Sequence, residues 1–558
     1  MATMDVHNNT TTNTTTTTSS TMLHSSVAEF YQNKTIFITG GTGFMGKVLL
    51  EKLIRSCPGI SKIYLLIRAK RGQASQERLQ HLLNSPLFDR LRKERPDDLK
   101  KIIAIEGDIT QPELAISNSD IALLSRSVNL VFHSAATVKF DEKLKLSVTI
   151  NMLGTQRLVE LCKRMDHLEA LVHVSTAYCN CDRTIVRETI YPPPIAPEQV
   201  STLVDALDES LVDTITPRLV GNRPNTYTFT KALTESWLQE NHGDIPVAIV
   251  RPSIVLSSIN EPMTGWVDNW NGPTGIIAAA GKGIFRTMLC HPDKVADFIP
   301  VDMVINLMLV TAWKTATAKS KEILVFNCST GQRMPITWSK FIGLCFVYMR
   351  KHPFSEVTWY PDGKITDSVV LNKVNTYLLH WLPAWIMDTA VWIVGGKPIM
   401  LKIQDKLSKA SKCLEYFTTN QWQFEDGNVQ RLFSQLSNED KKEFNFDVSN
   451  MKWEEYVENY VLGIRRFMFK EDEKTIPKAR SQLSKYYWFY RCLQVLSVMS
   501  VWHFLTLRYA PLRQLWSNAL RLLLHIARMM PLLHKRAMGK AASTHLTNIL
   551  SIMLVCKC

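Results

Sequence analysis

The stretch Thr39-Gly-Gly-Thr-Gly-Phe-Met-Gly46 decides the fold of this 558-residue chain. It follows a short apolar run at 35–38 and opens a helical pattern at 47–56. In this strand–turn–helix setting, Gly40 permits a tight turn, Gly43 lets the backbone approach a diphosphate, and Gly46 lets the helix pack closely on the strand. The first helical N–H groups, next to Phe44, favour an anion. The stretch therefore predicts a dinucleotide-binding unit.

The end of the second apolar run indicates which dinucleotide binds. Residues 63–71 read Ile-Tyr-Leu-Leu-Ile-Arg-Ala-Lys-Arg, where a site for NAD would place an acidic residue to accept from the ribose 2′-hydroxyl. Arg68 with Lys70 or Arg71 instead suits a 2′-phosphate, so we predict NADPH as the cofactor. A solvated basic turn is the alternative interpretation. Asp108 ends the third apolar run, where it would accept from adenine or cap a helix.

Apolar runs recur along the chain, at 63–67, 102–105, 130–132, 171–174, 247–250 and 323–326. Helix-like stretches separate several of them. This alternation predicts an α/β fold, a doubly wound parallel-sheet Rossmann domain, because parallel strands are buried on both faces and read as continuous apolar runs. Residues 183–224 break the rhythm and contain Tyr-Pro-Pro-Pro at 191–194, so we interpret them as an insertion or lid over a site.

Composition divides the chain into four segments. A Thr/Asn-rich arm at 1–30, which we expect to be disordered, precedes the Rossmann domain at 31–355; a smaller α-rich C-terminal domain at 356–470 and a hydrophobic basic tail at 471–558 follow. From 474 onward the chain has 13 Lys and Arg but no Asp or Glu, so the tail carries nearly all of the net charge of +14. Because these cations alternate with apolar runs, we predict membrane lipid as the partner and no nucleic acid.

Residues 486–507 are long enough to cross a hydrocarbon core, although Arg491, Gln494 and His503 interrupt them. Residues 515–533 resemble an interfacial helix, and 377–394 predict a buried or membrane-touching helix. The alternative is that these segments are core helices. We expect a membrane protein, single-pass or monotopic, with a cytosolic catalytic domain, at the endoplasmic reticulum rather than the peroxisome. The 11 Cys form no Cys-x-x-Cys pair or Cys/His cluster, so we predict no metal.

A second motif indicates the chemistry. Tyr227-Thr-Phe-Thr-Lys231 sets two functional side chains four residues apart on one helix face. The ammonium of Lys231 would stabilise a tyrosinate and so lower the pKa of Tyr227. Ser175 or Thr176, ending the preceding apolar run, would polarise a substrate carbonyl. A solvated helix pair is the alternative, but the order of Gly-rich turn, Ser/Thr and Tyr-x-x-x-Lys is more specific than any one part.

These motifs together resemble the extended short-chain dehydrogenase/reductase superfamily and, within it, the fatty acyl-CoA reductases. The similar stretches are TGGTGFMGK at 39–47, IYLLIRAKRGQ at 63–73, HVSTAYCN at 173–180, YTFTK at 227–231 and RPSIV at 251–255. The resemblance runs from about residue 34 to residue 469 and includes the C-terminal domain.

The resemblance implies NADPH-dependent reduction of a long-chain acyl-CoA through an aldehyde to a primary fatty alcohol, with release of CoA. Tyr227 would protonate the substrate oxygen, and Lys231 would tune Tyr227 and bind the nicotinamide ribose. Thr176, with Ser175 beside it, would stabilise the oxyanion. Further cofactor contacts would come from Ala135, Ala136, Pro252 and Ser253. Lys282 and Arg286 are candidate contacts for CoA phosphates, with a helix-surface role as the alternative.

Two other functions stay open on the sequence alone. Another extended reductase would act on a sterol or a nucleotide sugar. A catalytically silent protein would bind lipid or nucleotide at a membrane, although the complete set of Tyr227, Lys231 and Ser175/Thr176 argues against it. Whether the chain forms a homodimer is also open.

Overall fold

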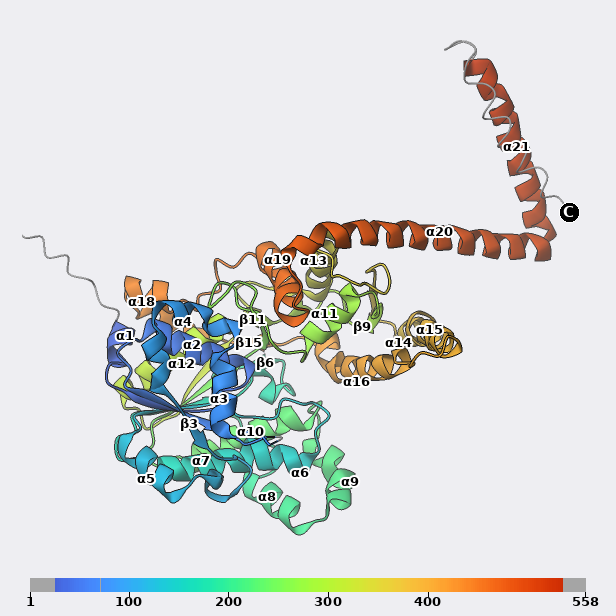
Figure 1. The fold of residues 1–558 in the computed structure, drawn as a ribbon. Coiled ribbons are helices and arrows are strands. Elements are labelled where there is room, and N and C mark those ends of the chain that lie inside the picture. The colour runs from blue at the N-terminus through green and yellow to red at the C-terminus, as the bar shows by residue number, and fades with distance from the viewer. Residues whose placement is uncertain (1–25, 71, 535–558) are drawn as a thin grey trace, which may run out of the picture. The chain divides into compact units, whose positions relative to one another are not determined.

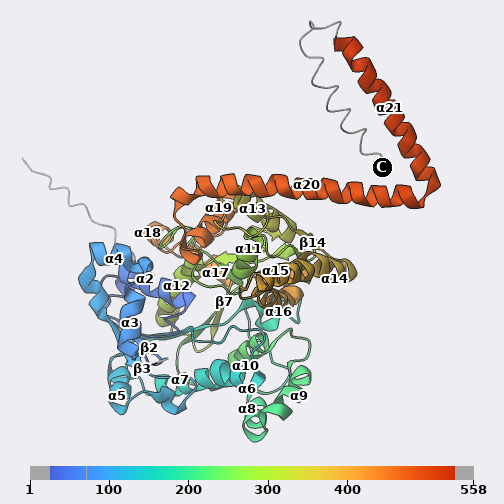
Figure 2. The ribbon, with the colours of Figure 1, turned by 45° about the vertical axis from the view of Figure 1, so that its right-hand side comes forward.

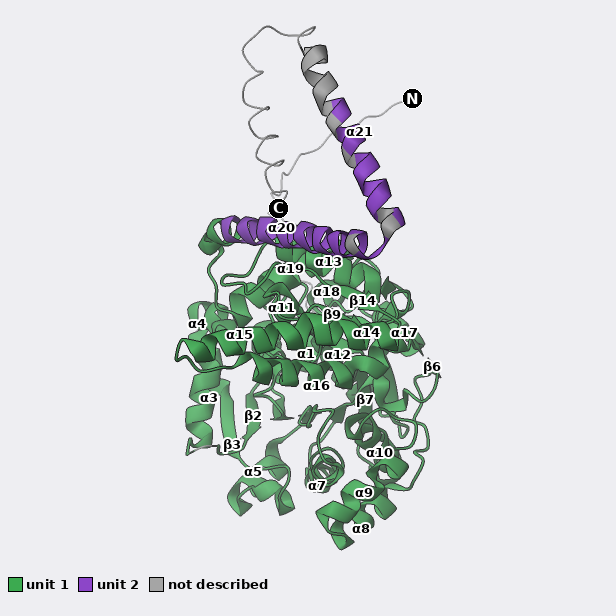
Figure 3. Ribbon diagram, turned by 90° about the vertical axis from the view of Figure 1, so that its right-hand side faces the viewer, with its two compact units in different colours: residues 1–480 green, residues 481–558 purple. Residues whose placement is uncertain are grey.

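The computed structural model describes residues 26–70 and 72–534, so most of the predicted N-terminal arm, Arg71 and the last part of the tail lie outside the described residues. The chain divides into two compact units, one up to Arg480 and one from Ser481 onward (Figure 3).

A sheet of seven parallel strands forms the centre of the first unit (Figure 1). Its order is β12-β7-β5-β4-β1-β2-β3, so the chain starts near the middle, reaches one edge and then crosses to the other side of β1. This doubly wound topology confirms the predicted fold class. The strands are β1 Thr35–Thr39, β2 Lys62–Ile67, β3 Ile102–Glu106, β4 Leu130–His133, β5 Ala170–Val174, β7 Val247–Pro252 and β12 Leu324–Cys328.

Helices cover both faces of this sheet (Figures 1 and 2). One face packs against α2 (Phe44–Ser56) and α12 (Val301–Ala318), and the other against α5 (Asn118–Ser127), α7 (Gly154–Cys162) and α10 (Thr226–Asn241). Within β1, Ile36 and Ile38 enter the first core and Phe37 enters the second. Because successive side chains point to opposite faces, both must be apolar here, which explains the continuous apolar runs.

The insertion at 183–224 contains β6 (Ile185–Val186), α8 (Pro197–Ala206) and α9 (Glu209–Val220). Its side chains share a core with α6 (Leu144–Ser147), the π-helix η4 (Val148–Leu153) and α10. Val200 and Val212 of the insertion and Phe229 of α10 are fully buried in that core. The insertion therefore packs directly on the helix that carries the Tyr-x-x-x-Lys motif.

The α-rich segment predicted as a separate domain at 356–470 lies in the same unit as the sheet. Two of its strands pair with earlier ones: β14 (Lys364–Thr366) with β9 (Thr287–Leu289), and β15 (Gln423–Phe424) with β6. Its helices and those near it are α11 Pro273–Gly281, α13 Trp338–Lys351, α14 Val369–Thr376, η6 Tyr377–Trp381, α15 Leu382–Ile393, α16 Met400–Thr419, α17 Gly427–Ser434, α18 Asn438–Glu443 and α19 Trp453–Gly463. These strand pairs join the C-terminal segment to the sheet domain.

Two long helices end the described chain, α20 (Ile476–Arg508) and α21 (Ala510–His534). The second unit begins within α20, at Ser481, whereas the sequence predicts the tail from 471. Across residues 26–70 and 72–534, no helix combines the length and the apolar character that a membrane span needs.

Candidate active site

The Gly-rich turn after β1 has the geometry that the sequence predicts. Gly40 has a φ of +75°, and a Cβ there would lie 2.6 Å from the backbone nitrogen of Ala135. The N–H of Gly43 donates to the carbonyl of Gly40 over 3.0 Å. A Cβ on Gly46 would lie 2.4 Å from that same carbonyl oxygen. Gly40 and Gly46 therefore exclude any side chain, which keeps the turn tight against β4 and α2.

The start of α2 fits a dinucleotide diphosphate. Gly43 is its N-cap residue, no side chain caps the helix, and its first turn, beginning at Phe44, has no acidic residue. A Cβ on Gly43 would meet only the Gly40 oxygen within 4 Å, at 3.2 Å. The first N–H groups of the helix and its dipole are thus free to face an anion.

The two residues predicted at the adenosine end of the cofactor are neighbours. Arg68 follows β2, and its Nη1 lies 3.4 Å from Oδ2 of Asp108. Burial raises the pKa of Asp108, but hydrogen bonds from Thr110 and the charge of Arg68 outweigh this and lower it. The Arg68 side chain is 56% exposed, and Lys70 is exposed in the same loop. Arg71 lies outside the described residues.

Helix α10 places Tyr227 and Lys231 on consecutive turns. Its N-cap is Asn225, whose Oδ1 accepts from the Thr228 N–H over 2.9 Å. Lys231 is buried, and its Nζ donates to the carbonyl oxygen of Val174 over 2.7 Å. The ammonium therefore joins α10 to the end of β5, where the predicted hydroxyl residues begin.

The expected lowering of the Tyr227 pKa by Lys231 is not found. Burial raises the pKa of Tyr227, and a hydrogen bond with Thr176 opposes burial without reversing it. Burial also lowers the pKa of Lys231 to about 8, although the charge of Glu235 raises it. The sequence argument did not account for the loss of hydration of the phenol and the ammonium inside the protein, which disfavours the charged form of each. It also did not account for the hydrogen bond that Lys231 donates to the carbonyl of Val174. Tyr227 is consequently a protonated phenol at neutral pH.

Thr176 rather than Ser175 is the hydroxyl residue that meets the phenol. A hydrogen bond of Thr176 partly opposes the rise in the pKa of Tyr227 that burial causes, and its Oγ1 donates to the carbonyl oxygen of Pro252 over 3.4 Å. Burial raises the pKa of the neighbouring Cys179 thiol, and the hydroxyl of Ser175 only slightly opposes that rise. This arrangement brings Thr176, Tyr227 and the end of β7 together, as the sequence predicts. Ser253 follows Pro252 and is 6% exposed.

Asn151 is a site residue that the sequence analysis missed. Its Oδ1 accepts from the N–H of Thr137 over 2.9 Å, and its Nδ2 donates to Oγ1 of Thr230 over 3.0 Å. It therefore joins the loop that contains Ala135 and Ala136 to α10. Asn151 lies in η4, a π-helix, and π-helices are rare and frequently occur at functional sites. No local pattern in the sequence predicts one.

Two buried histidines lie side by side at the ends of β4 and β5. His133 and His173 are paired across the strands, with ring centroids 5.2 Å apart. His133 lies between hydroxyls, with Nδ1 2.6 Å from Oγ1 of Thr39 and Nε2 2.9 Å from Oγ1 of Thr155. Burial, followed by the charge of Lys231, lowers the pKa of both imidazoles, that of His133 to about 3. Both rings are therefore neutral and add no positive charge near Lys231.

A buried ion pair between Arg251 and Glu235 lies one helical turn beyond the Tyr-x-x-x-Lys motif. Nε and Nη2 of Arg251 lie 2.9 and 2.5 Å from the two carboxylate oxygens of Glu235, and neither side chain is more than 1% exposed. Arg251 also donates to the carbonyls of Arg187 and Thr189 in the insertion. Glu235 lies one turn beyond Lys231, so the spacing could have indicated this partner. The pair connects α10, β7 and the insertion.

Aromatic side chains from distant segments surround the phenol. The ring of Phe140 lies 5.9 Å from that of Tyr227 and 5.3 Å from that of Phe417 at the end of α16. Tyr178 packs edge-on against Phe417 and Trp422. The sequence could not predict this, because these residues come from separate parts of the chain. The result is an apolar wall beside a proton donor.

The candidate CoA residues have other partners. Nζ of Lys282 donates to the carbonyl of Ser355 over 2.5 Å, lies 3.4 Å from Oε1 of Glu471 and 4.3 Å from the ring centre of Phe469. Nε of Arg286 lies 3.4 Å from the carbonyl oxygen of Asp362. These contacts hold the Lys282 side chain, which is only 17% exposed, and a role toward CoA stays a prediction for both residues.

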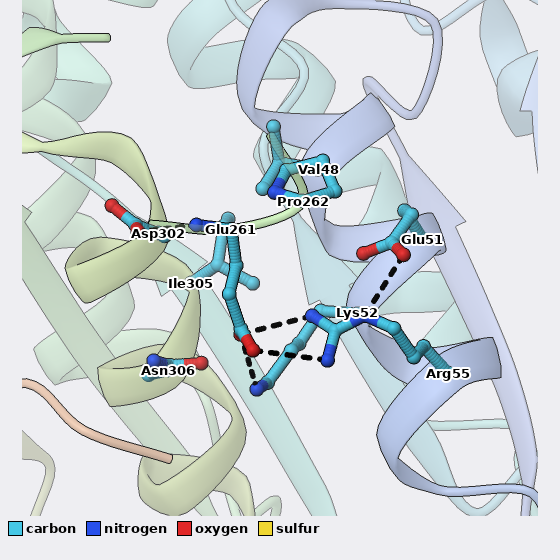
Figure 4. A pocket seen from close by; sticks show the side chains of 9 residues that line it. All are labelled: Val48, Glu51, Lys52, Arg55, Glu261, Pro262, Asp302, Ile305 and Asn306. Carbon is cyan, nitrogen blue, oxygen red and sulfur yellow. Dashed lines mark hydrogen bonds and ion pairs between the residues drawn. The ribbon is translucent and has the colours of Figure 1, made fainter. Parts of the chain in front are cut away.

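A separate pocket between α2, α12 and the loop at 261–262 is an ion-pair cluster (Figure 4). Glu261 lies between Lys52 and Arg55, at 2.6 and 2.9 Å, and Arg55 also pairs with Glu51 at 2.9 Å. None of the predicted site residues lines this pocket. Both cations of the pocket, Lys52 and Arg55, are thus paired with carboxylates.

Comparisons with known proteins agree with this geometry. Two family models, both described as male sterility protein, match residues 38–308 and 379–471, and the first is a nicotinamide-dinucleotide-binding model. Fatty acyl-CoA reductase 1 of Rattus norvegicus is 42% identical over 491 residues, which cover 88% of this chain and 95% of the relative. Fatty acyl-CoA reductase 2 of Mus musculus is 42% identical over 492 residues, covering 88% of this chain and 96% of the relative.

Solved structures share the fold. The terminal R domain of the myxalamid biosynthetic pathway has a TM-score of 0.51 at 18% identity, covering 78% of this chain and 92% of that chain. A reductase domain of a non-ribosomal peptide synthetase from Mycobacterium tuberculosis has a TM-score of 0.52 at 16% identity, covering 78% and 91%. Given the identity to the named relatives over nearly their whole length, this chain belongs to the fatty acyl-CoA reductase family and has its nicotinamide-dinucleotide-binding domain.

Proposed function

We propose that this protein reduces long-chain fatty acyl-CoA to a primary fatty alcohol with NADPH and releases CoA. One observation carries the proposal: the protonated phenol of Tyr227 meets the hydroxyl of Thr176 beside an apolar aromatic wall. The names of the relatives support the substrate class.

The chemistry requires two reductions. In the first, hydride adds to the thioester carbonyl carbon and the oxygen takes a proton, which gives a thiohemiacetal. Its C–S bond then breaks as the hydroxyl proton passes to sulfur, giving an aldehyde and CoA thiol. In the second, a further hydride and proton convert the aldehyde to the alcohol. Bound NADPH supplies the hydride for each reduction.

The side chains of the site supply the proton and stabilise the substrate oxygen. Because burial keeps Tyr227 protonated, the phenol donates its proton to the carbonyl oxygen as negative charge develops there. The hydroxyl of Thr176 stabilises the same oxygen. Lys231 is mostly protonated at neutral pH because its pKa is about 8, and its ammonium, held at the end of β5, would bind the nicotinamide ribose.

Three features support NADPH as the particular cofactor. The start of α2 and its Gly-rich turn accommodate a diphosphate. The guanidinium of Arg68 is exposed at the end of β2, with Lys70 nearby. The neighbouring carboxylate, Asp108, is partly neutralised by Arg68 and Thr110. These charges suit a 2′-phosphate better than a bare 2′-hydroxyl.

We also propose that the protein works at a membrane, single-pass or monotopic, with the catalytic unit in the cytosol at the endoplasmic reticulum. The support is the acid-free basic tail and the exposure of apolar side chains such as Trp488 and Val498 on α20. Flotation of the full chain and of a chain lacking 481–558 with anionic vesicles tests the tail. Equal flotation of both would remove the tail from this proposal.

One assay tests the reaction. Purified protein is incubated with NADPH or NADH and a series of acyl-CoAs, and CoA, aldehyde and alcohol are measured separately. We expect two NADPH to be oxidised for each alcohol formed. Oxidation that occurs only with a sterol or a nucleotide sugar would support the other reductase function, and no oxidation with any substrate would support the silent protein.

A further inference from the structure

Most of the large apolar side chains that the first unit exposes lie between 369 and 399. This segment forms α14, η6 and α15, which project with α16 from the rest of the unit (Figures 1 and 2). Trp392, Ile393 and Val394 are 70, 71 and 81% exposed. The other members are Val369, Val370, Leu371, Val374, Tyr377, Leu378, Leu382, Trp385, Ile386, Met387 and Ile399. So large a patch on one segment marks an interaction surface.

Two polar side chains of this segment, those of Asp388 and His380, are turned inward. Asp388 is 7% exposed, and its carboxylate accepts from the N–H groups of Ile399, Met400 and Leu401 at the start of α16. His380 is also buried, and its Nε2 accepts from the N–H of Arg286 over 2.8 Å. Burial therefore lowers the pKa of His380 to about 4 and keeps it neutral. The outer face is left apolar because the internal contacts satisfy these groups.

Charge indicates what covers the patch. Asp388 is the only acidic residue in 368–404, whereas Lys373, Lys397 and Lys402 are all exposed. Within the described part of the chain, no ion pair engages these three lysines. Trp and Tyr side chains bordered by lysines are typical of the interface of a bilayer with anionic headgroups. A symmetric contact with a second copy would instead place lysine against lysine with no acid between them.

One helix connects this patch to the active site. Helix α16 starts at Met400 beside the patch, and its 20 residues span about 30 Å. Near its other end, Phe417 contacts Phe140, which contacts Tyr227. Between these points Leu407 and Leu414 pack on an apolar cluster of α11 and the following segment. Helix α16 therefore has apolar side chains near the patch, at its middle and at the end that approaches the phenol.

We propose that residues 369–399 dock the catalytic unit on an anionic bilayer as a monotopic surface, independently of the tail. The segment holds the carboxylate of Asp388 and the imidazole of His380 inside and exposes Lys373 and Lys397, so its helices lie in the interface rather than across it. The delivery of an acyl chain from the bilayer to Tyr227 along α16 rests on the proposed function, whereas the docking itself does not.

The first test measures membrane docking directly and does not depend on enzymatic activity. Full-length protein is mixed with phosphatidylcholine–phosphatidylserine vesicles that contain brominated acyl chains, which quench tryptophans in contact with them. We expect Trp385→Phe and Trp392→Phe each to reduce the quenched fraction of the fluorescence. Trp270→Phe is the matched control, because Trp270 is 50% exposed but lies outside the segment. Unchanged quenching in both segment variants would overturn the proposal.

The second test measures how loss of docking changes the kinetics of acyl-CoA reduction. The double variant Trp392→Asp, Ile393→Asp should raise KM for a long-chain acyl-CoA carried in vesicles by about tenfold, a change of about 1.4 kcal/mol. Its kcat/KM for a soluble short-chain acyl-CoA should stay unchanged. The control Val347→Asp changes an exposed apolar residue of α13. No activity in any variant, with quenching intact, would count against the proposed function but not against docking.

A third measurement tests whether a second copy of the chain, rather than lipid, covers the patch. Sedimentation velocity of wild type and of the double variant, in detergent, reports on association through this face. We expect no difference between them. A wild-type dimer that the two aspartates dissociate would assign the face to a second copy of the chain and overturn lipid docking.

Discussion

Lys231 donates a 2.7 Å hydrogen bond from Nζ to the carbonyl oxygen of Val174, the last residue of β5. The next two residues along the chain are Ser175 and Thr176, so this contact sets the distance between α10 and the hydroxyl that meets Tyr227. A single hydrogen bond thus positions the phenol of Tyr227, the ammonium of Lys231 and the hydroxyl of Thr176 relative to one another.

Replacing Tyr227 by Phe removes only the phenolic oxygen. Because that oxygen is the proposed proton donor, we expect reduction of acyl-CoA to fall by about a hundredfold or more. NADPH binding, measured by calorimetry, should change little, since Lys231 and the Gly-rich turn are intact. Full activity in this variant would remove Tyr227 from the mechanism.

The rate should depend on the charge of Lys231. Its folded-state pKa is lowered to about 8 by burial, from an ordinary value of 10.5, so we expect kcat/KM to decline as the pH rises through about 8. Between these two values the unfolded chain binds more protons than the folded one at this residue, so Lys231 makes folding more favourable as the pH rises. Unfolding caused by Lys231 cannot therefore explain the decline. A flat profile to pH 10 would contradict the role of the ammonium.

The buried pair of Glu235 and Arg251 gives a prediction about stability and pH together. Glu235→Gln leaves the guanidinium buried without a charged partner, which should cost about 3–5 kcal/mol in the free energy of unfolding. It also removes the charge that raises the pKa of Lys231, so the alkaline decline of kcat/KM should move to lower pH. Asp405→Asn, at the exposed pair with Lys409, is the control and should change neither. A loss of stability without the pH shift would leave the pair with a structural role only.

The sequence predicted the parts of the fold and the site that depend on local pattern. The seven strands coincide with continuous apolar runs, because both faces of the sheet are covered. The glycines, Tyr227 and Lys231 were identified because their chemistry requires a fixed spacing along one turn or one helix face.

The sequence could not predict features that depend on burial or on distant segments. The direction of the Tyr227 pKa follows from how deeply α10 is packed, which no spacing encodes. Phe417 contacts Phe140, which contacts Tyr227, and it comes from a distant segment whose strand β15 pairs with β6. The family resemblance suggests Lys282 as a contact for CoA phosphates, but its actual partner, Glu471, lies far along the chain, where no local pattern connects the two.

Cofactor choice should depend on Arg68. Its guanidinium is 56% exposed and contacts Asp108 only at 3.4 Å, so it can exchange that partner for the 2′-phosphate of NADPH. Arg68→Ser should therefore raise KM for NADPH by about tenfold, about 1.4 kcal/mol, because a charge-assisted hydrogen bond is lost. KM for NADH, which has no 2′-phosphate, should stay the same. The matched control is Arg90→Ser on α4 (Asp89–Glu94), where the arginine is 58% exposed and pairs with Glu94. Equal effects of Arg68→Ser on both cofactors would indicate that Arg68 supports the loop rather than recognising phosphate.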